Sequence, residues 1–271
     1  MYKITIVLKK IYWIICKKIG FSITFRDERK SVHSKKLKKF NTVTGIYFLP
    51  KFAYQDVIRK EIIKNRIFDK DVFDLSKKFI KPNSIVIDAG ANYGQMSILF
   101  SKLYKNVDVY SFEASKYIYD ILCKNVKENS KNIIPVNCIL SDKNSKKFIE
   151  HPKITPVGTY GALNLQILKN SQTKDGYEVF EKKIDDYKFK KKISFMKIDV
   201  QGWDLKVLKG SVNTINIHRM PIIFEYEKQF ENQMNINFSD YINFFKRINY
   251  KFVTTFNSNF LVVPSEQKKL K

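Results

Sequence analysis

The chain has 271 residues, of which 44% are hydrophobic, so it is long and apolar enough to bury a core of its own. This composition excludes a wholly disordered chain. The formal net charge is +24, but only six of the 50 basic residues are arginine. Arginine is the residue that reads bases and binds phosphates with two parallel hydrogen bonds, so a specific nucleic-acid-binding role is disfavoured despite the charge.

The N-terminal segment MYKITIVLKKIYWIICKKIGF predicts a basic amphipathic helix, because Lys3, Lys10 and Lys17 share one face and aliphatic residues another. Its longest unbroken apolar run, residues 11–16, is far shorter than the roughly 20 residues that span a bilayer. No signal-peptide cleavage site is visible. The alternatives are a helix packed on the protein's own core, a peripheral anchor to anionic membrane through residues 1–20, and an uncleaved targeting segment.

The three cysteines, Cys16, Cys123 and Cys138, form no CxxC pattern, and the three histidines lie far apart. Such spacing argues against a disulfide framework and against a metal site, and it is typical of a reducing compartment. We therefore expect a cytoplasmic protein without bound metal, with attachment at the inner face of a membrane as the alternative. We also expect an N-terminal extension over residues 1–50 and the main domain over residues 51–271.

Helical periodicity covers much of residues 52–80, and from residue 84 onward strands alternate with amphipathic helices. A less regular region runs from about 141 to 176, and a strand and turn follow at 177–187. The expected strands are 84–88, 107–113, 132–140, 193–200, 220–227, 251–256 and 260–264, and the expected helices are 93–104, 115–129, 203–215 and 240–250. This order predicts an α/β fold with a mainly parallel sheet, helices on both faces and an antiparallel C-terminal hairpin.

The stretch DAGANYG, residues 88–94, directly follows the first strand of the alternating region. Gly90 allows a tight turn and the close approach of a ligand to the backbone, and Gly94 allows close packing where the next helix starts. Glu113 ends the following strand, in a place from which an acid accepts both hydroxyls of a ribose. Strand, loop, helix and acid in this order predict a nucleoside-binding site.

Asp88 narrows the choice of ligand. The loop spacing is neither GxGxxG nor GxxxxGK[ST], and an acid before the glycine turn would repel a pyrophosphate. S-adenosylmethionine fits, because it carries an ammonium, a carboxylate, a ribose and an adenine but no phosphate. The expected cofactor contacts are the amine at Asp88, the carboxylate at the backbone of Gly90, Ala91, Asn92 and Gly94, and the ribose at Glu113.

Further acids and hydroxyls follow the later strands. Ser141 and Asp142 follow the third strand and are expected at the adenine edge, although Asp142 also suits a turn or a helix cap. Asp199 and Glu225 end the fourth and fifth strands, where parallel sheets place their ligands, and are the expected catalytic residues. Asp199 is either a desolvated base or paired with Lys197 or another cation. For Glu225 the alternative is a salt bridge at the sheet edge.

The pieces VIDAGANYGQMS, VYSFEAS, ILSD, KKIDDY, FMKIDVQGWDLKVLKG and PIIFEYE together resemble the FkbM-type S-adenosylmethionine-dependent methyltransferases, over residues 80–230. The resemblance implies a class I methyltransferase fold and O-methylation, often of sugar hydroxyls in surface polysaccharides or of small glycosylated metabolites. It also implies cofactor contacts at Asp88, Gly90, Asn92, Gly94, Glu113 and Asp142. One departure is Gln201, where the family commonly has the glutamate of DVEG.

Three functional hypotheses follow. The favoured one is a methyltransferase acting on a hydroxyl of a sugar, glycan or small metabolite, with Asp199 as base or positioning acid. Residues 151–165, with Gly158, Tyr160 and Gly161, form either a loop that closes over this acceptor or a plain surface insertion. A nucleic-acid methyltransferase suits the charge, but the loop after the fourth strand reads DVQG and no Pro-Cys pair exists. The third hypothesis is a catalytically silent protein of the same fold that docks on a membrane.

Overall fold

The computed structural model describes residues 37–51, 53–150 and 176–267. They belong to a compact unit, Ser34–Lys271. The predicted amphipathic helix of residues 1–20 and the predicted acceptor loop of residues 151–165 lie outside the described residues. In the described part of the chain, no helix has both the length and the apolar character that a membrane crossing requires.

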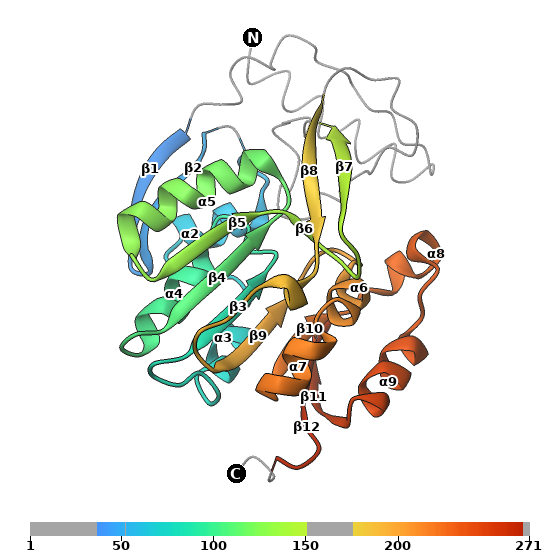
Figure 1. The fold of residues 1–271 in the computed structure, drawn as a ribbon. Coiled ribbons are helices and arrows are strands. Elements are labelled where there is room, and N and C mark those ends of the chain that lie inside the picture. The colour runs from blue at the N-terminus through green and yellow to red at the C-terminus, as the bar shows by residue number, and fades with distance from the viewer. Residues whose placement is uncertain (1–36, 52, 151–175, 268–271) are drawn as a thin grey trace, which may run out of the picture. The chain divides into compact units, whose positions relative to one another are not determined.

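A seven-stranded sheet organises the described residues (Figure 1). Its strands in spatial order are β5 (Ile133–Asn137), β4 (Asp108–Glu113), β3 (Ile85–Ala89), β9 (Ile193–Ile198), β10 (Ile222–Glu225), β12 (Asn259–Pro264) and β11 (Tyr250–Phe256). The first five run parallel, and β12 is antiparallel to both of its neighbours. The mainly parallel sheet and the antiparallel C-terminal hairpin are therefore as predicted from the sequence.

The central strand β3 is buried along its whole length because helices cover both faces of the sheet. Its alternate side chains enter two separate cores: Val86 points to one face, and Ile85 and Ile87 point to the other. The first core is formed with α2 (Val57–Ile63), α3 (Lys70–Ser76), α4 (Gln95–Leu103) and α5 (Lys116–Asn129). The second is formed with α6 (Asp204–Lys209), α7 (Val212–His218) and α9 (Phe238–Arg247).

Two expected elements are each split in the structure. The strand expected over 132–140 becomes β5 and β6 (Ile139–Leu140), because β5 pairs with β4 whereas β6 pairs with β8 (Gly176–Lys182). With β7 (Ser145–Glu150), these two strands form a separate three-stranded sheet. The helix expected over 203–215 breaks at Gly210, where a Cβ atom would lie 1.8 Å from the carbonyl oxygen of Ser141.

A hairpin of β1 (Leu37–Thr42) and β2 (Gly45–Pro50) packs against α5. Tyr47 and Leu49 of β2 are fully buried in the first core. The buried Asn125 of α5 accepts a hydrogen bond from Phe48 N at 2.6 Å and donates one to Tyr93 O at 2.8 Å. This one amide therefore joins the hairpin, the helix and the glycine loop. The domain boundary at residue 50 stays a prediction.

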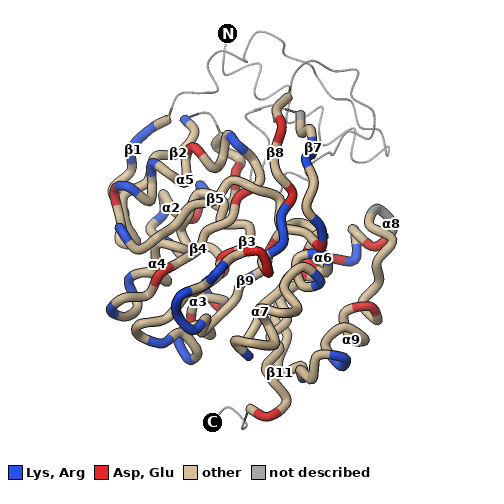
Figure 2. Tube along the Cα trace, in the orientation of Figure 1, with Lys and Arg blue, Asp and Glu red and all other residues tan. Residues whose placement is uncertain are grey.

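Basic residues are spread over elements on both faces of the sheet (Figure 2). One dense run, KFKKK at residues 188–192, directly precedes β9 and so lies at the amino end of that strand. In a parallel sheet, ligands bind at the opposite, carboxyl ends of the strands. The run is therefore placed away from the strand ends that carry the candidate site.

We expect Asn125→Ala to lower the free energy of unfolding by about 2 to 4 kcal/mol, because it removes the partners of two backbone groups, Phe48 N–H and Tyr93 C=O. Urea unfolding measures the change. Lys124→Ala, on the exposed side of the same helix, is the matched control and should change stability by less than about 0.5 kcal/mol. Equal effects of the two substitutions would contradict the linking role of Asn125.

Candidate active site

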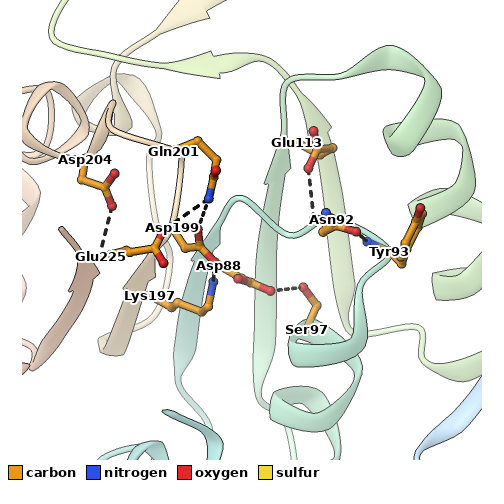
Figure 3. Close-up of polar contacts among 10 residues, drawn as sticks. All are labelled: Asp88, Asn92, Tyr93, Ser97, Glu113, Lys197, Asp199, Gln201, Asp204 and Glu225. Atoms are coloured by element: carbon orange, nitrogen blue, oxygen red, sulfur yellow. Dashed lines mark hydrogen bonds and ion pairs between the residues drawn. The ribbon is translucent and has the colours of Figure 1, made fainter. Parts of the chain in front are cut away.

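The glycine loop lies between β3 and α4, at the carboxyl edge of the sheet (Figure 3). Gly90, Asn92 and Gly94 all have positive φ angles, of 84°, 51° and 87°. Gly90 N and Ala91 N both donate to Phe112 O of β4, at 3.0 and 2.9 Å. The loop therefore folds back over the end of the neighbouring strand, and its shape is set by backbone bonds.

At both glycines of the loop, a neighbouring atom leaves no room for a side chain. A Cβ at Gly90 would lie 1.8 Å from the carbonyl oxygen of Asp199, so this glycine lets the loop touch the end of β9. A Cβ at Gly94 would lie 2.6 Å from Leu122 of α5, which agrees with the expected packing role. The close approach at Gly90 is made by the protein's own backbone, a reason that the sequence pattern does not reveal.

Glu113, the expected ribose-binding residue, ends β4 directly beneath the loop. Its carboxylate accepts hydrogen bonds from Asn92 N at 3.0 Å and from Ser115 N at 2.8 Å. Burial raises the pKa of Glu113 to about 7, although these backbone bonds oppose the shift. Each carboxylate oxygen keeps a lone pair after these bonds, so the ionised form is able to accept two ribose hydroxyls.

Asp88 is fully buried, opposite Lys197 in the register of β3 and β9. Its Oδ2 accepts a hydrogen bond from Ser97 at 2.5 Å, whereas its Oδ1 has no hydrogen-bond partner. Burial raises the pKa of Asp88, against the opposing effects of Lys197 and Ser97. The structure thus places Asp88 beneath the loop with one buried acceptor left over.

Asp199 forms an ion pair with Lys197, with 3.0 Å between Oδ2 and Nζ. The pairing with Lys197 is therefore present in the structure, and a catalytic role of Asp199 stays a prediction. Burial alone would raise the pKa of Asp199, but Lys197, Glu225 and Gln201 outweigh it and hold the pKa below its ordinary value. Burial alone would also lower the pKa of Lys197, but nearby carboxylates led by Asp199 and Asp88 hold it high. Both groups are therefore charged at neutral pH.

Glu225 ends β10, as Asp199 follows the end of the neighbouring strand β9, so the two acids lie side by side. Gln201 Nε2 lies between the two acids, 3.4 Å from Asp199 Oδ1 and 3.2 Å from Glu225 Oε2. Burial and the adjacent charge of Asp199 hold the pKa of Glu225 far above its usual range. Two carboxyls this close do not both ionise readily, so Glu225 keeps its proton while Asp199 is charged.

Two further acids complete this network, and the sequence patterns did not single them out. Asp204, fully buried at the start of α6, accepts a hydrogen bond from Glu225 N at 3.3 Å. Burial and the charge of Asp199 raise the pKa of Asp204 to about 7. Burial also raises the pKa of Asp69, which feels both Lys197 and Asp199.

The segment that carries Asp69 is attached to the glycine loop's helix. Gln95, buried in the first turn of α4, accepts a hydrogen bond from Phe68 N and donates one to Arg66 O, each at 2.9 Å. Its amide thus fixes the chain that precedes α3 beside the site. No sequence pattern predicted that Gln95 would hold this segment.

Ser141 and Asp142, expected at the end of the third strand, instead follow the short strand β6 and not β5. Ser141 N bonds Lys182 O of β8 at 2.9 Å, and its carbonyl packs against Gly210. The polar side chain that does reach the end of β4 is Asn137, which donates to Glu113 O at 2.8 Å. The expected contact of Ser141 and Asp142 with adenine stays a prediction. The sequence analysis did not single out Asn137, whose amide binds the end of β4.

The residues present fit S-adenosylmethionine. Asp88 Oδ1 is a buried acceptor without a partner, which suits the ligand's ammonium, and Glu113 has acceptor capacity for its ribose. The ligand is a cation overall, and carboxyl groups predominate at this edge of the sheet (Figure 3). Among the described residues of this network, Lys197 is the cation, and it is engaged with Asp199.

Comparison with known proteins agrees with this geometry. Residues 88–252 match the family described as the methyltransferase FkbM domain. A protein of Haloferax volcanii named hexuronic acid methyltransferase AglP is 23% identical over 173 residues, which cover 62% of this chain and 66% of that protein, just under two thirds of its length.

Two solved structures show a weak overall likeness. Methyltransferase FkbM from Methylobacillus flagellatus has a TM-score of 0.46 at 14% identity, over 70% of this chain and 50% of that one. Trm5b from Pyrococcus abyssi has a TM-score of 0.44 at 11% identity, over 83% of this chain and 54% of that one. The assignment rests instead on the family match, which includes the glycine loop, Glu113, Asp199 and Glu225. The chain belongs to the family of FkbM methyltransferase domains, whose cofactor is S-adenosylmethionine, as the sequence predicted.

Proposed function

We propose that the protein transfers the methyl group of S-adenosylmethionine to a hydroxyl of a sugar, a surface glycan or a small metabolite. The observation that carries the proposal is the pair of carboxyls, Asp199 and Glu225, next to the glycine loop, one charged and one neutral. The name of the Haloferax volcanii relative, a hexuronic acid methyltransferase, supports a sugar acceptor. The cytoplasmic location and the membrane contact through residues 1–20 stay predictions.

Bound S-adenosylmethionine supplies a methyl group on a positively charged sulfur. Held by the glycine loop and by Glu113, it would give this methyl to the acceptor oxygen and keep the electron pair of the carbon–sulfur bond on sulfur. The hydroxyl proton passes to Asp199, which is charged and has a side chain 22% exposed at the site. Its lowered pKa makes Asp199 a weak base, so its main contribution is to orient the hydroxyl until the oxygen becomes acidic during transfer.

Glu225 acts differently from Asp199 because it keeps its proton. A neutral carboxyl donates a hydrogen bond, and the charged Asp199 beside it is the natural acceptor. Gln201 holds both acids in place through its amide. In this arrangement the neutral Glu225 positions Asp199 through a hydrogen bond.

The same geometry favours a sugar or metabolite over nucleic acid. The dense lysine run of residues 188–192 lies at the amino end of β9, whereas Asp199 directly follows the carboxyl end. A polyanion held by those lysines would be at the wrong end of the strand. At the site itself it would meet Asp199 and the other carboxyls.

Asp199→Asn is expected to reduce kcat/KM by about 100- to 1,000-fold, because a neutral amide neither orients the hydroxyl as a charged acceptor nor takes up its proton during transfer. Glu225→Gln should retain activity within about threefold, since glutamine also donates to Asp199 and still accepts from Gln201. A methyl-transfer screen against neutral, amino-bearing and acidic sugars measures both variants. Calorimetric binding of S-adenosylmethionine by each variant is the folding control. If Glu225→Gln lost as much activity as Asp199→Asn, the neutral assignment of Glu225 would be wrong.

The affinity for S-adenosylmethionine is expected to weaken by about tenfold between pH 8 and pH 6. The pKa of Glu113 is about 7, and only the ionised form accepts both ribose hydroxyls, so protonation removes the competent state. Calorimetry across this range measures the dissociation constant. Glu113→Gln is the control, because the ligand's own amine titrates identically with both proteins. A pH dependence that survives in Glu113→Gln would exclude Glu113 as its source.

Gln201→Glu replaces the amide donor between Asp199 and Glu225 with a third carboxyl. Both hydrogen bonds from Gln201 are lost, and repulsion raises the pKa of Asp199. We expect the acidic limb of the pH–rate profile to move upward by about one pH unit. The profile of kcat/KM against pH for the two proteins tests this, and an unmoved acidic limb would show that Gln201 does not set the ionisation of Asp199.

A further inference from the structure

The segments that precede β3, β4, β5 and β9 come together at the amino edge of the sheet, because these neighbouring strands run parallel. Hydrogen bonds join the segments to one another. Asn83 N donates to Lys105 O at 3.0 Å, and Lys191 Nζ donates to Asn106 O at 3.2 Å. Together they form the amino-edge surface, which consists of residues 81–84, 104–107, 130–132 and 188–192.

The amino-edge surface is strongly basic, and the run before β9 is its densest part (Figure 2). Its four segments contain no acid and seven lysines, which are Lys81, Lys105, Lys131, Lys188, Lys190, Lys191 and Lys192. Lys191 forms an ion pair at 2.6 Å with Asp108, the first residue of β4. The other six are exposed, and none of them forms an ion pair with another described residue. Positive charge without a carboxylate partner therefore faces solvent along this edge.

Two exposed apolar side chains lie next to these lysines. Ile217, near the end of α7, is 70% exposed, and Lys192 Nζ donates a hydrogen bond to its carbonyl oxygen at 3.2 Å. Tyr104, which ends α4 directly before Lys105, is 43% exposed. Proteins that bind at a membrane interface combine basic side chains with aliphatic and aromatic ones that enter the headgroup layer. The amino-edge surface and its two flanking side chains have this combination.

The residue types favour an anionic membrane over nucleic acid. The amino-edge surface contains no arginine, and Arg219, which precedes β10, is held by Glu266 and by the carbonyl oxygen of Ile248. Arginine is the residue that binds phosphates and bases with a fixed geometry, whereas lysine is a hydrated point charge. Point charges suffice for a layer of anionic lipid headgroups, where attraction depends on their number. Exposed Ile217 also gains from a headgroup layer but not from a phosphate backbone.

We propose that the amino-edge surface docks the protein on the anionic headgroups of a membrane, with Ile217 and Tyr104 entering the headgroup layer. The candidate active site lies at the opposite ends of the same strands, roughly 20 Å away, so its carboxyl groups are screened from the lipid charge. Docked in this way, the site faces away from the bilayer and is open to an acceptor in solution. This docking is separate from the expected contact through residues 1–20, and it does not depend on the identity of the acceptor.

Sedimentation of the full chain with lipid vesicles tests the docking. We expect binding to phosphatidylcholine vesicles that contain phosphatidylglycerol, and binding at least about tenfold weaker to phosphatidylcholine alone. Each lysine near an anionic surface strengthens binding by roughly fivefold, so Lys81→Gln/Lys105→Gln/Lys190→Gln should weaken it by about 100-fold. Ile217→Ser should weaken it by about tenfold, because an aliphatic side chain is lost from the headgroup layer.

Lys143→Gln/Lys182→Gln/Lys228→Gln is the matched control, because it removes the same charge from three exposed lysines outside the amino-edge surface. It should change vesicle binding by less than about threefold, since screened charges away from the contact contribute little. Urea unfolding checks that every variant is folded. Equal losses in the two triple variants would overturn the inference, as would unchanged binding of the first or no binding to anionic vesicles. Tighter binding to single-stranded RNA than to vesicles, lost in the first triple variant, would also overturn it and assign the surface to nucleic acid.

Discussion

The candidate site depends on one buried positive charge, the ammonium of Lys197. Its side chain is 5% exposed, and such burial is costly unless the charge has partners. The pairing of β3 with β9 places Asp88 opposite it, and Asp199 lies 3.0 Å away. By holding Asp199 ionised, Lys197 also fixes its neighbour, because Glu225 then keeps a proton. One lysine thus leads to different protonation states of two adjacent acids.

The two halves of the site meet through backbone rather than through side chains. Gly90 of the cofactor loop touches the carbonyl of Asp199, and Asp199 N donates to Ala89 O at 3.0 Å. These contacts exist because β3 and β9 are neighbours in the sheet although they are distant in the chain. A change in the cofactor loop is therefore transmitted directly to Asp199, the acid proposed to orient the acceptor, without a flexible side chain between them.

The sequence predicted the strand-end acids Asp88, Glu113, Asp199 and Glu225 because period and polarity mark where a buried strand stops. It did not predict which of them are charged, since ionisation depends on partners that folding brings together. The buried Asp204 is the clearest case, because its burial comes from α6 packing on the sheet and leaves no local pattern. The splits at 132–140 and 203–215 have the same origin, in pairing and packing between distant segments.

The net charge of the whole chain and the charge at the carboxyl edge of its sheet differ in sign. Interactions between exposed charges fade beyond a Debye length of about 8 Å at physiological salt, so dispersed surface lysines contribute little at the carboxyl edge of the sheet. Within that edge, carboxyls of the Asp199 network predominate (Figure 3). This edge therefore suits a cationic ligand such as S-adenosylmethionine. The net charge of +24 is therefore a property of the whole sequence, whereas the charge at the carboxyl edge of the sheet is set by a few buried contacts around Lys197.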